Sequence, residues 1–161
     1  MIPKAAYKAE NEFMQLAIDE AREGIYNQHG GPFGSVVVKD GKVIGRGHNR
    51  VLVNKDSTCH GEISAIRDAE KNIDSYDLSG AVLYTTGEPC SMCLAACVWA
   101  NIEKVYYGCN IQDNSIIGFR DSALDKLFGG RIAFTDFLTQ VDRDACLKLF
   151  EEYNGLEKTI Y

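Results

Sequence analysis

The sequence predicts an α/β protein, a three-layer α/β/α sandwich around a mixed five-stranded sheet. Two apolar strands joined by a tight turn come early, and helix-like and strand-like segments then alternate along the chain. A hairpin supplies antiparallel strands, whereas strand–helix–strand connections supply parallel strands that are covered by helices. The chain of 161 residues has no internal repeat or linker. We therefore expect a single domain over residues 1–161.

The first half of the chain gives the clearest pattern. Apolar residues recur at helical spacing over residues 8–28, which predicts an amphipathic helix. A run of three valines predicts a strand over 33–39. Asp40-Gly41 is a hairpin turn signal, and a returning strand is expected over 43–48.

The second half alternates between helix and strand. We expect a helix over 61–73, a strand over 81–86 between two glycines, a helix rich in small residues over 90–100, and a strand over 104–108. Toward the C-terminus the signals weaken. There the sequence predicts a short helix over 122–128, a short strand over 132–134 and a final helix over 142–153.

Composition excludes several classes of protein. The chain is 45% hydrophobic and 25% charged, as is ordinary for a globular protein. Its longest apolar run, residues 94–100, is far shorter than the roughly 18–20 residues of a membrane span. No basic head and apolar stretch opens the chain, so we expect a cytoplasmic protein. The net charge of −6 disfavours a nucleic-acid partner.

Two short fragments, each at the start of a predicted helix, carry the chemistry: His60-Gly61-Glu62 and Pro89-Cys90-Ser91-Met92-Cys93. Cys90 and Cys93 share one face of a first helical turn, and His60 supplies a third ligand. Three ligands of mixed sulfur and nitrogen suit zinc and leave its fourth position open for water, whose pKa zinc lowers to about 7. Glu62 lies near enough to shuttle protons. The set predicts metal-assisted hydrolysis.

Other interpretations of the same residues are open. A thioredoxin-like redox pair would use the two cysteines but leave His60 and Glu62 unexplained. A structural zinc site would need a fourth ligand, and a zinc-stabilised interaction module would have no use for the Glu62 carboxylate. The candidates for a fourth ligand are Cys59, Cys97 and Cys109. These three and Cys146 are otherwise expected to be small buried hydrophobic residues.

The two fragments match the H-x-E…P-C-x-x-C pattern of the cytidine deaminase-like zinc deaminases. The resemblance runs from the first helix to the C-terminus and looks most like guanine deaminases of the bacterial type. The other segments that match this family are Gly30–Gly34, Gly47–Asn49, Thr85–Cys93, Gly118–Ser122 and Tyr161. It implies a cytidine deaminase-like fold and one zinc per subunit, bound by His60, Cys90 and Cys93. It also implies that Glu62 moves protons while guanine is hydrolysed to xanthine and ammonia.

The resemblance also implies how the base is bound. Asn49 would hydrogen-bond the base, Phe33 would lie against its ring, the backbone N–H of Gly61 would hold a substrate oxygen, and Asp121 and Tyr161 would hold the purine edge. Each side chain has a structural interpretation as well. Asn49 is also typical of a turn, Phe33 of a core, Asp121 of a helix cap and Tyr161 of a frayed end.

Some features depart from the pattern. Gly61 stands where the bacterial guanine deaminases carry alanine. His60–Ser64 and Gly45–Asn49 look like fungal cytosine deaminases, so cytosine or another amino-heterocycle stays open as the substrate. A tRNA adenosine deaminase would be expected to carry a basic tail, and the acidic chain has none that is obvious. Trp99 either walls the pocket or packs in the core.

Assembly is implied by the resemblance alone. In that family the C-terminal segment crosses to a second subunit. The protein is therefore expected to be a homodimer in which Tyr161 completes the neighbour's site, with a small-molecule nucleobase as ligand and no membrane partner.

Overall fold

A computed structural model of the chain, which describes residues 1–127 and 136–159, contains one five-stranded sheet with the order β2-β1-β3-β4-β5. β1 pairs antiparallel with β2 and β3, whereas β3, β4 and β5 run parallel. The sheet is therefore mixed, as predicted. The strands are β1 (Gly34–Lys39), β2 (Lys42–His48), β3 (Ala81–Gly87), β4 (Lys104–Cys109) and β5 (Leu138–Gln140).

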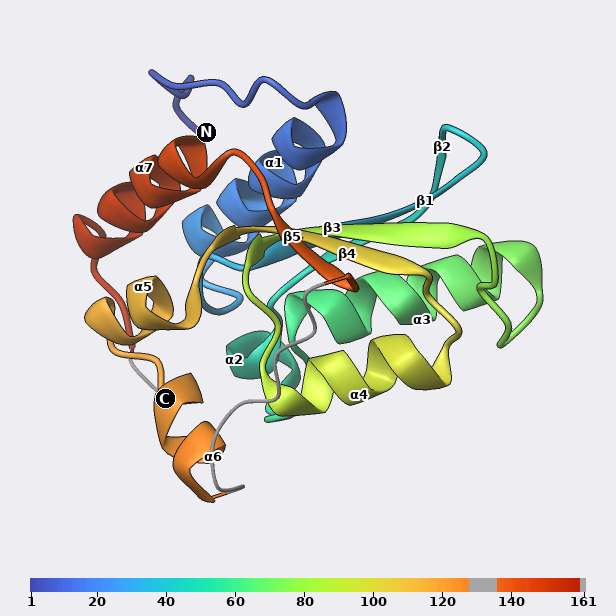
Figure 1. The fold of residues 1–161 in the computed structure, drawn as a ribbon. Helices are drawn as coiled ribbons and strands as arrows, with labels where there is room; N and C mark the ends of the chain where they lie inside the picture. The colour runs from blue at the N-terminus through green and yellow to red at the C-terminus, as the bar shows by residue number, and fades with distance from the viewer. Residues whose placement is uncertain (128–135, 160–161) are drawn as a thin grey trace.

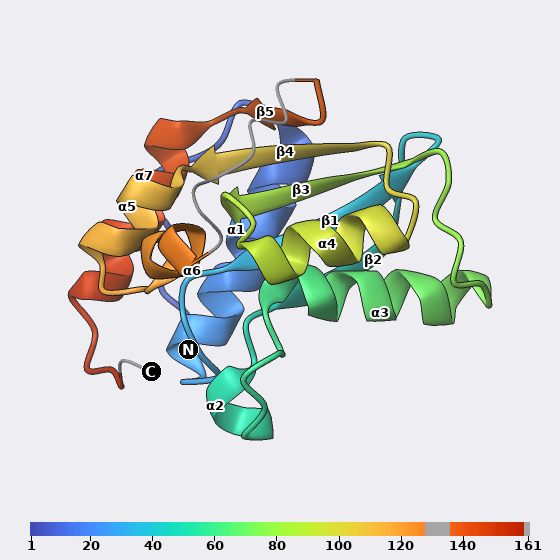
Figure 2. The same cartoon turned by 60° about the horizontal axis from the view of Figure 1, so that its bottom comes forward.

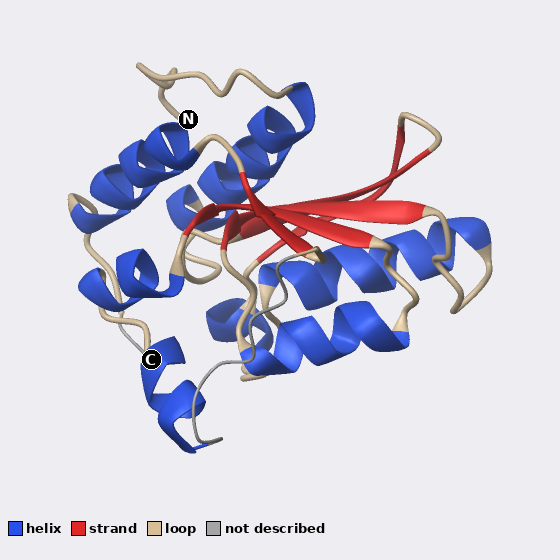
Figure 3. Cartoon of the chain, in the orientation of Figure 1, coloured by secondary structure: helices blue, strands red, loops and turns tan. Residues whose placement is uncertain are grey.

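Helices cover both faces of this sheet. α1 (Glu12–Tyr26) and α7 (Arg143–Asn154) lie on one face, and α3 (Gly61–Ile73) and α4 (Ser91–Trp99) lie side by side on the other (Figures 1 and 2). Coloured by secondary structure, the strands form a layer between two layers of helices (Figure 3). The predicted α/β/α sandwich is confirmed.

The hairpin turn follows from its two central residues. Asp40 and Gly41 have φ values of 51° and 72°, and Lys39 pairs with Lys42 across the turn. Two positive φ angles define a type I′ turn, whose twist matches that of the flanking strands. A register shift between Val37 and Val38 then adds a bulge to the hairpin.

Several boundaries differ from the prediction. α1 begins at Glu12 rather than at residue 8, because the Asn11 side chain accepts hydrogen bonds from the N–H groups of Phe13 and Met14 and caps the helix there. Two short helices were not predicted: α2 (Val51–Asn54) and α5 (Ile111–Ile116). Four to six residues are too few for helical periodicity to be recognised.

The C-terminal part of the chain has the weakest periodic pattern in its sequence. α6 (Asp121–Leu127) matches the helix expected over 122–128 within the described residues, and α7 matches the helix expected over 142–153. The strand expected over 132–134 lies outside the described residues. The structure instead adds β5 to the parallel edge of the sheet, beside β4.

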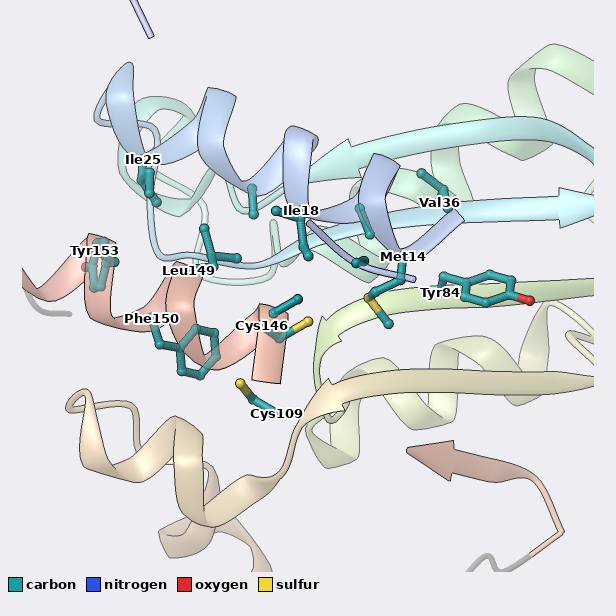
Figure 4. Close-up of a cluster of buried hydrophobic side chains, with 14 of the residues drawn as sticks. Met14, Ile18, Ile25, Val36, Tyr84, Cys109, Cys146, Leu149, Phe150 and Tyr153 are labelled. Atoms are coloured by element: carbon teal, nitrogen blue, oxygen red, sulfur yellow. The ribbon is translucent and has the colours of Figure 1, made fainter. Parts of the chain in front are cut away.

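Alternation along β1 divides the core between the two faces. Val36 and Val38 join the cluster under α1 and α7, whereas Val37 joins the cluster under α3 and α4. Figure 4 shows the first cluster, in which Met14, Ile18 and Leu149 are fully buried. All six cysteines are unpaired and buried, which confirms the prediction for the four outside the motif. No described helix is long and apolar enough to span a membrane.

Candidate metal centre and pocket

Two helix N-termini bring the candidate metal ligands of the two sequence fragments together. His60 immediately precedes α3, Cys90 immediately precedes α4, and both residues have extended backbone conformations. Their carbonyls accept the first hydrogen bonds of the helices, from Ser64 and Leu94. α3 and α4 lie side by side (Figure 2). The side chains of His60 and Cys90, which precede these helices, are in contact.

The geometry of the three candidate ligands fits zinc. Nδ1 of His60 lies 3.6 Å from Sγ of Cys90 and 3.5 Å from Sγ of Cys93. Tetrahedral zinc with ordinary Zn–S and Zn–N bond lengths would hold sulfur and nitrogen about 3.6 Å apart. Among the described residues, the cluster of ligand atoms contains these three side chains and no other. No fourth His, Cys, Asp or Glu ligand joins the cluster from the part of the chain that the structure describes, which does not support a structural site completed by Cys59, Cys97 or Cys109.

In the absence of metal, the three candidate ligands shift one another's pKa values. The hydrogen bond from Cys93 and the neighbouring His60 lower the pKa of Cys90 to about 4, against the effect of burial. Burial favours neutral His60, but the hydrogen bond to Cys90 and the charges of Glu62, Cys90 and Asp121 raise its pKa to about 9. The hydrogen bond to Cys90, together with burial, raises the pKa of Cys93. At neutral pH the metal-free site thus holds one thiolate, one thiol and an imidazolium.

Glu62, the second residue of α3, is a buried acid beside the cluster. Only 5% of its surface is exposed, and it lines a cavity with His60 and Cys90. Burial, reinforced by the negative charge of Cys90, raises the pKa of Glu62 to about 7. A carboxyl group that exchanges its proton near neutral pH is suited to general acid–base chemistry.

The cluster opens into two adjoining cavities. The inner cavity, of about 30 Å³, is lined by Phe33, Asn49, His60, Glu62, Glu88, Cys90, Asn114, Phe119 and Asp121. The outer cavity, of about 370 Å³, shares four of these residues and adds apolar side chains from α6. Its size lies in the range of small-molecule sites. A ligand entering from solvent would pass α6 and reach the His60–Cys90 side of the cluster.

Three of the expected base-binding residues, Phe33, Asn49 and Asp121, line the inner cavity. Asn49 is fully buried and lines the cavity, and its Oδ1 accepts a hydrogen bond from the Val51 N–H, so it is also a turn residue. Phe33 lines the cavity too, and its ring packs edge-on against Phe119 at 4.8 Å. Gly61 begins α3, where a Cβ atom would lie 2.7 Å from the Phe33 carbonyl oxygen. That contact explains why glycine, rather than alanine, stands here.

The structure gives different results for the other three residues that the sequence analysis named, Asp121, Tyr161 and Trp99. Asp121 lines both cavities as the first residue of α6, and its Oδ2 accepts a hydrogen bond of 2.9 Å from Asn114 Nδ2. Tyr161 lies outside the described residues. Trp99, expected to wall the pocket or to pack in the core, does neither within the described chain, because 85% of its surface is exposed.

The sequence analysis assigned no role to three residues that line the inner cavity: Glu88, Asn114 and Phe119. Glu88 lies just after β3, where its Oε2 accepts a hydrogen bond from the Ile111 N–H, and Asn114 lies in the short helix α5. Glu88 precedes the Pro89–Cys93 fragment directly, and that proximity was the one available signal. Nothing in the local sequence marks Asn114, because α5 itself was not recognised.

The comparisons with known proteins agree with this site. A family model for the cytidine and deoxycytidylate deaminase zinc-binding region matches residues 7–109. The chain belongs to this family of zinc-binding deaminases, and His60, Cys90 and Cys93 are its candidate zinc ligands.

Two kinds of deaminase are among the proteins that are similar to this chain. Guanine deaminase of Bacillus subtilis (strain 168) is 44% identical over 114 residues, which cover 71% of this chain and 73% of the relative. A tRNA-specific adenosine deaminase of Aquifex aeolicus (strain VF5) is 35% identical over 146 residues, which cover 91% and 85%. A structure of guanine deaminase from Nitrosomonas europaea superposes with a TM-score of 0.78 at 28% identity, covering 94% of this chain and 88% of that one.

Proposed function

We propose that the protein hydrolyses guanine to xanthine and ammonia. The observation that carries the proposal is the buried carboxyl group of Glu62, which lies beside three zinc-type ligands and lines a small cavity. A carboxyl group placed there serves no purpose in a purely structural metal site. The similarity to guanine deaminases supports guanine as the base.

The roles of the chain's own residues follow from their positions. Zinc, when bound by His60, Cys90 and Cys93, supplies a Lewis acid that makes water reactive at neutral pH. Glu62 takes a proton from the attacking water, passes it to the ring nitrogen beside the amine-bearing carbon, and later delivers a proton to the departing ammonia. Overall, water adds its oxygen to the carbon and the amine leaves as ammonia.

Base binding is assigned to the walls of the inner cavity. Asn49 and Asp121 supply polar groups for the edge of the base, and Phe33 supplies a ring face. The backbone N–H of Gly61, at the positive end of α3, is suited to hold a substrate oxygen. Completion of the site by Tyr161 of a second subunit, within a homodimer, belongs to the same proposal.

Two other substrates deserve a direct test. Cytosine is a smaller free base that the same polar groups could hold. A tRNA adenosine is favoured by the extent of the similarity to tRNA-specific adenosine deaminases. The net charge of −6 argues against it, because a polyanion is captured mainly by basic side chains.

A panel of substrates tests the proposal. The zinc-loaded protein is incubated separately with guanine, cytosine, adenine, their nucleosides and a tRNA anticodon stem-loop, and ammonia release is measured. We expect guanine to give the highest kcat/KM. If ammonia is released faster from cytosine or from the stem-loop, that molecule and not guanine is the substrate. Full zinc content with no ammonia from any member would instead favour a non-catalytic zinc module.

A further inference from the structure

Asn114 carries a buried carboxamide that neither the metal centre nor the apolar core uses. It is 1% exposed and lines the inner cavity together with Phe33, Asn49 and Asp121. Burying a polar group is unfavourable unless each of its donors and acceptors is paired. The partners of its two halves therefore indicate what the side chain does.

The nitrogen half of the amide is fully engaged. Nδ2 donates to Oδ2 of Asp121 at 2.9 Å and to the backbone oxygen of Glu88 at 3.3 Å. Both neighbours are acceptors, so a flipped amide would set its oxygen against a carboxylate and a carbonyl. The hydrogen-bonding environment therefore fixes which way the amide faces.

The oxygen half has no donor. Within the described part of the chain, Oδ1 of Asn114 is buried and accepts no hydrogen bond. It lies beside the end of β3, where a Cβ atom on Gly87 would be 3.1 Å from Oδ1 and 2.8 Å from the Phe33 ring. The unpaired acceptor is thus next to the aromatic wall of the cavity.

The helix that carries Asn114 is held in place on both sides. Asn110 and Asp113 form a capping box at the start of α5, and Arg143 of α7 binds Asp113 at 2.7 Å. Oε2 of Glu88 accepts a hydrogen bond of 2.9 Å from the Ile111 N–H. These contacts hold the backbone of α5, and the two hydrogen bonds of Nδ2 hold the carboxamide itself.

We propose that Asn114 is a specificity-determining residue whose Oδ1 accepts a ring N–H of the bound base. The inference rests on the proposed function and extends it. Asn114 and Asp121 together present acceptors to one edge of the ligand, so the pocket selects a base that offers N–H groups there. A free purine has such ring N–H groups, whereas glycosidic attachment in a nucleoside removes one of them.

Analogues that each rule out an N–H group at one ring position test this assignment. 7-Deazaguanine and 9-deazaguanine replace one imidazole nitrogen by C–H, and 1-methylguanine removes the N–H at position 1. The wild-type, zinc-loaded protein should lose at least tenfold in kcat/KM with one of the three, because a buried acceptor then stays unpaired. Inhibition constants replace kcat/KM for any analogue that is not turned over.

Two substitutions separate the acceptor from the donor of the amide. Asn114→Leu removes both, so it should abolish the preference for guanine over that analogue. Asn114→Asp keeps an acceptor but loses the donor to Asp121, so it should lower turnover and keep the preference. Asn114→Ala serves in place of Asn114→Leu if the larger side chain prevents folding, as judged by zinc content and Tm.

The outcomes are distinct from those of the substrate panel. If wild type discriminates against none of the analogues, or if Asn114→Leu weakens guanine and all three analogues by the same factor, Asn114 only positions Asp121 or holds a water, and the inference is overturned. Failure of the proposed function would show in the wild type, as absent turnover of guanine. The dissociation constants of the same four purines, measured by calorimetry, then still give the preference.

Discussion

The backbone oxygen of Phe33 and the α-carbon of Gly61 lie in such close contact that a Cβ atom at position 61 would be only 2.7 Å from that oxygen. The same Phe33 oxygen accepts a hydrogen bond of 2.8 Å from the Asn49 N–H. One carbonyl thus connects the start of α3, which follows the metal ligand His60, to two walls of the pocket. The contact couples the metal centre to the geometry of base binding.

Substituting Gly61 tests this coupling. Gly61→Ala should push Phe33 and Asn49 out of position by a few tenths of an ångström and lower kcat/KM by about three- to tenfold, since small misplacements are costly in catalysis. Zinc content should not change. Gly155→Ala is the matched control, because its Cβ would meet nothing closer than 3.5 Å. Equal activity of the two variants would show that the contact does not matter for turnover.

Zinc binding should release protons. At pH 7 the metal-free site carries a proton on His60, whose pKa is raised to about 9, and one on Cys93, while Cys90 with a pKa of about 4 is already ionised. Zinc requires a neutral imidazole and two thiolates, so about two protons leave per ion and affinity rises with pH. Calorimetry in two buffers of different ionisation enthalpy measures this number. Release of less than one proton would contradict the assigned ligands.

Two buried cysteines one helical turn apart provide a matched comparison. Cys93 and Cys97 are both fully buried in α4, but only Cys93 belongs to the ligand cluster. Cys93→Ala should lose zinc and the stabilisation that a bound ion gives the folded state. Cys97→Ala should keep one zinc per chain and lose only about 1 kcal/mol of core packing. Metal analysis and thermal unfolding check both, and zinc retention by Cys93→Ala would reassign the ligands.

His29 should make stability depend on pH. Burial, Arg50 and His48 lower its pKa, against the opposing charge of Glu23, and Nδ1 of His29 lies 2.8 Å from Nε2 of His48. Glu20 in turn lies 3.1 Å from the other nitrogen of His48. The unfolded chain, in which His29 titrates near its ordinary pKa of about 6.5, binds more protons than the folded chain just below that pH. Stability is therefore full above about pH 6.5 and falls as the pH decreases.

The matching experiment compares Tm at pH 7.5 and pH 5.5 for the metal-free protein and for His29→Gln. The glutamine cannot titrate, so its Tm should fall less, by on the order of 1–2 °C. Chelator is present throughout, so loss of zinc at low pH does not contribute. An identical decrease in Tm in both proteins would show that His29 does not contribute to the pH dependence of stability.

Much of the fold was predictable because its signals are local. A short stretch of sequence was enough to predict each of three features: the strand β1 from its valine run, the hairpin turn from Asp40-Gly41, and the helix α3 from its apolar periodicity. The edge strand β5 could not be predicted, because three residues that pair only with β4 leave no periodic pattern. The start of α1 was misplaced because the cap at Asn11 overrides the apolar pattern before it.

The metal centre was also predictable, since its ligands sit in two short fragments that each begin a helix. Asn114 was not, because its importance arises from contacts with Asp121 and Glu88 that only the folded chain brings together. Trp99 shows the opposite error. It lies at the end of α4, the helix that carries Cys93, which suggested a pocket wall or a core position, but the helix turns that side chain to the surface.

The most direct test of the account is the rate of xanthine formation from guanine by Glu62→Gln at matched zinc content. The amide keeps the shape of the side chain but cannot carry a proton between water, base and ammonia. The account predicts one zinc per chain and a kcat reduced by about 10²–10⁴-fold. A zinc-loaded Glu62→Gln protein that forms xanthine within a few-fold of the wild-type rate would contradict it.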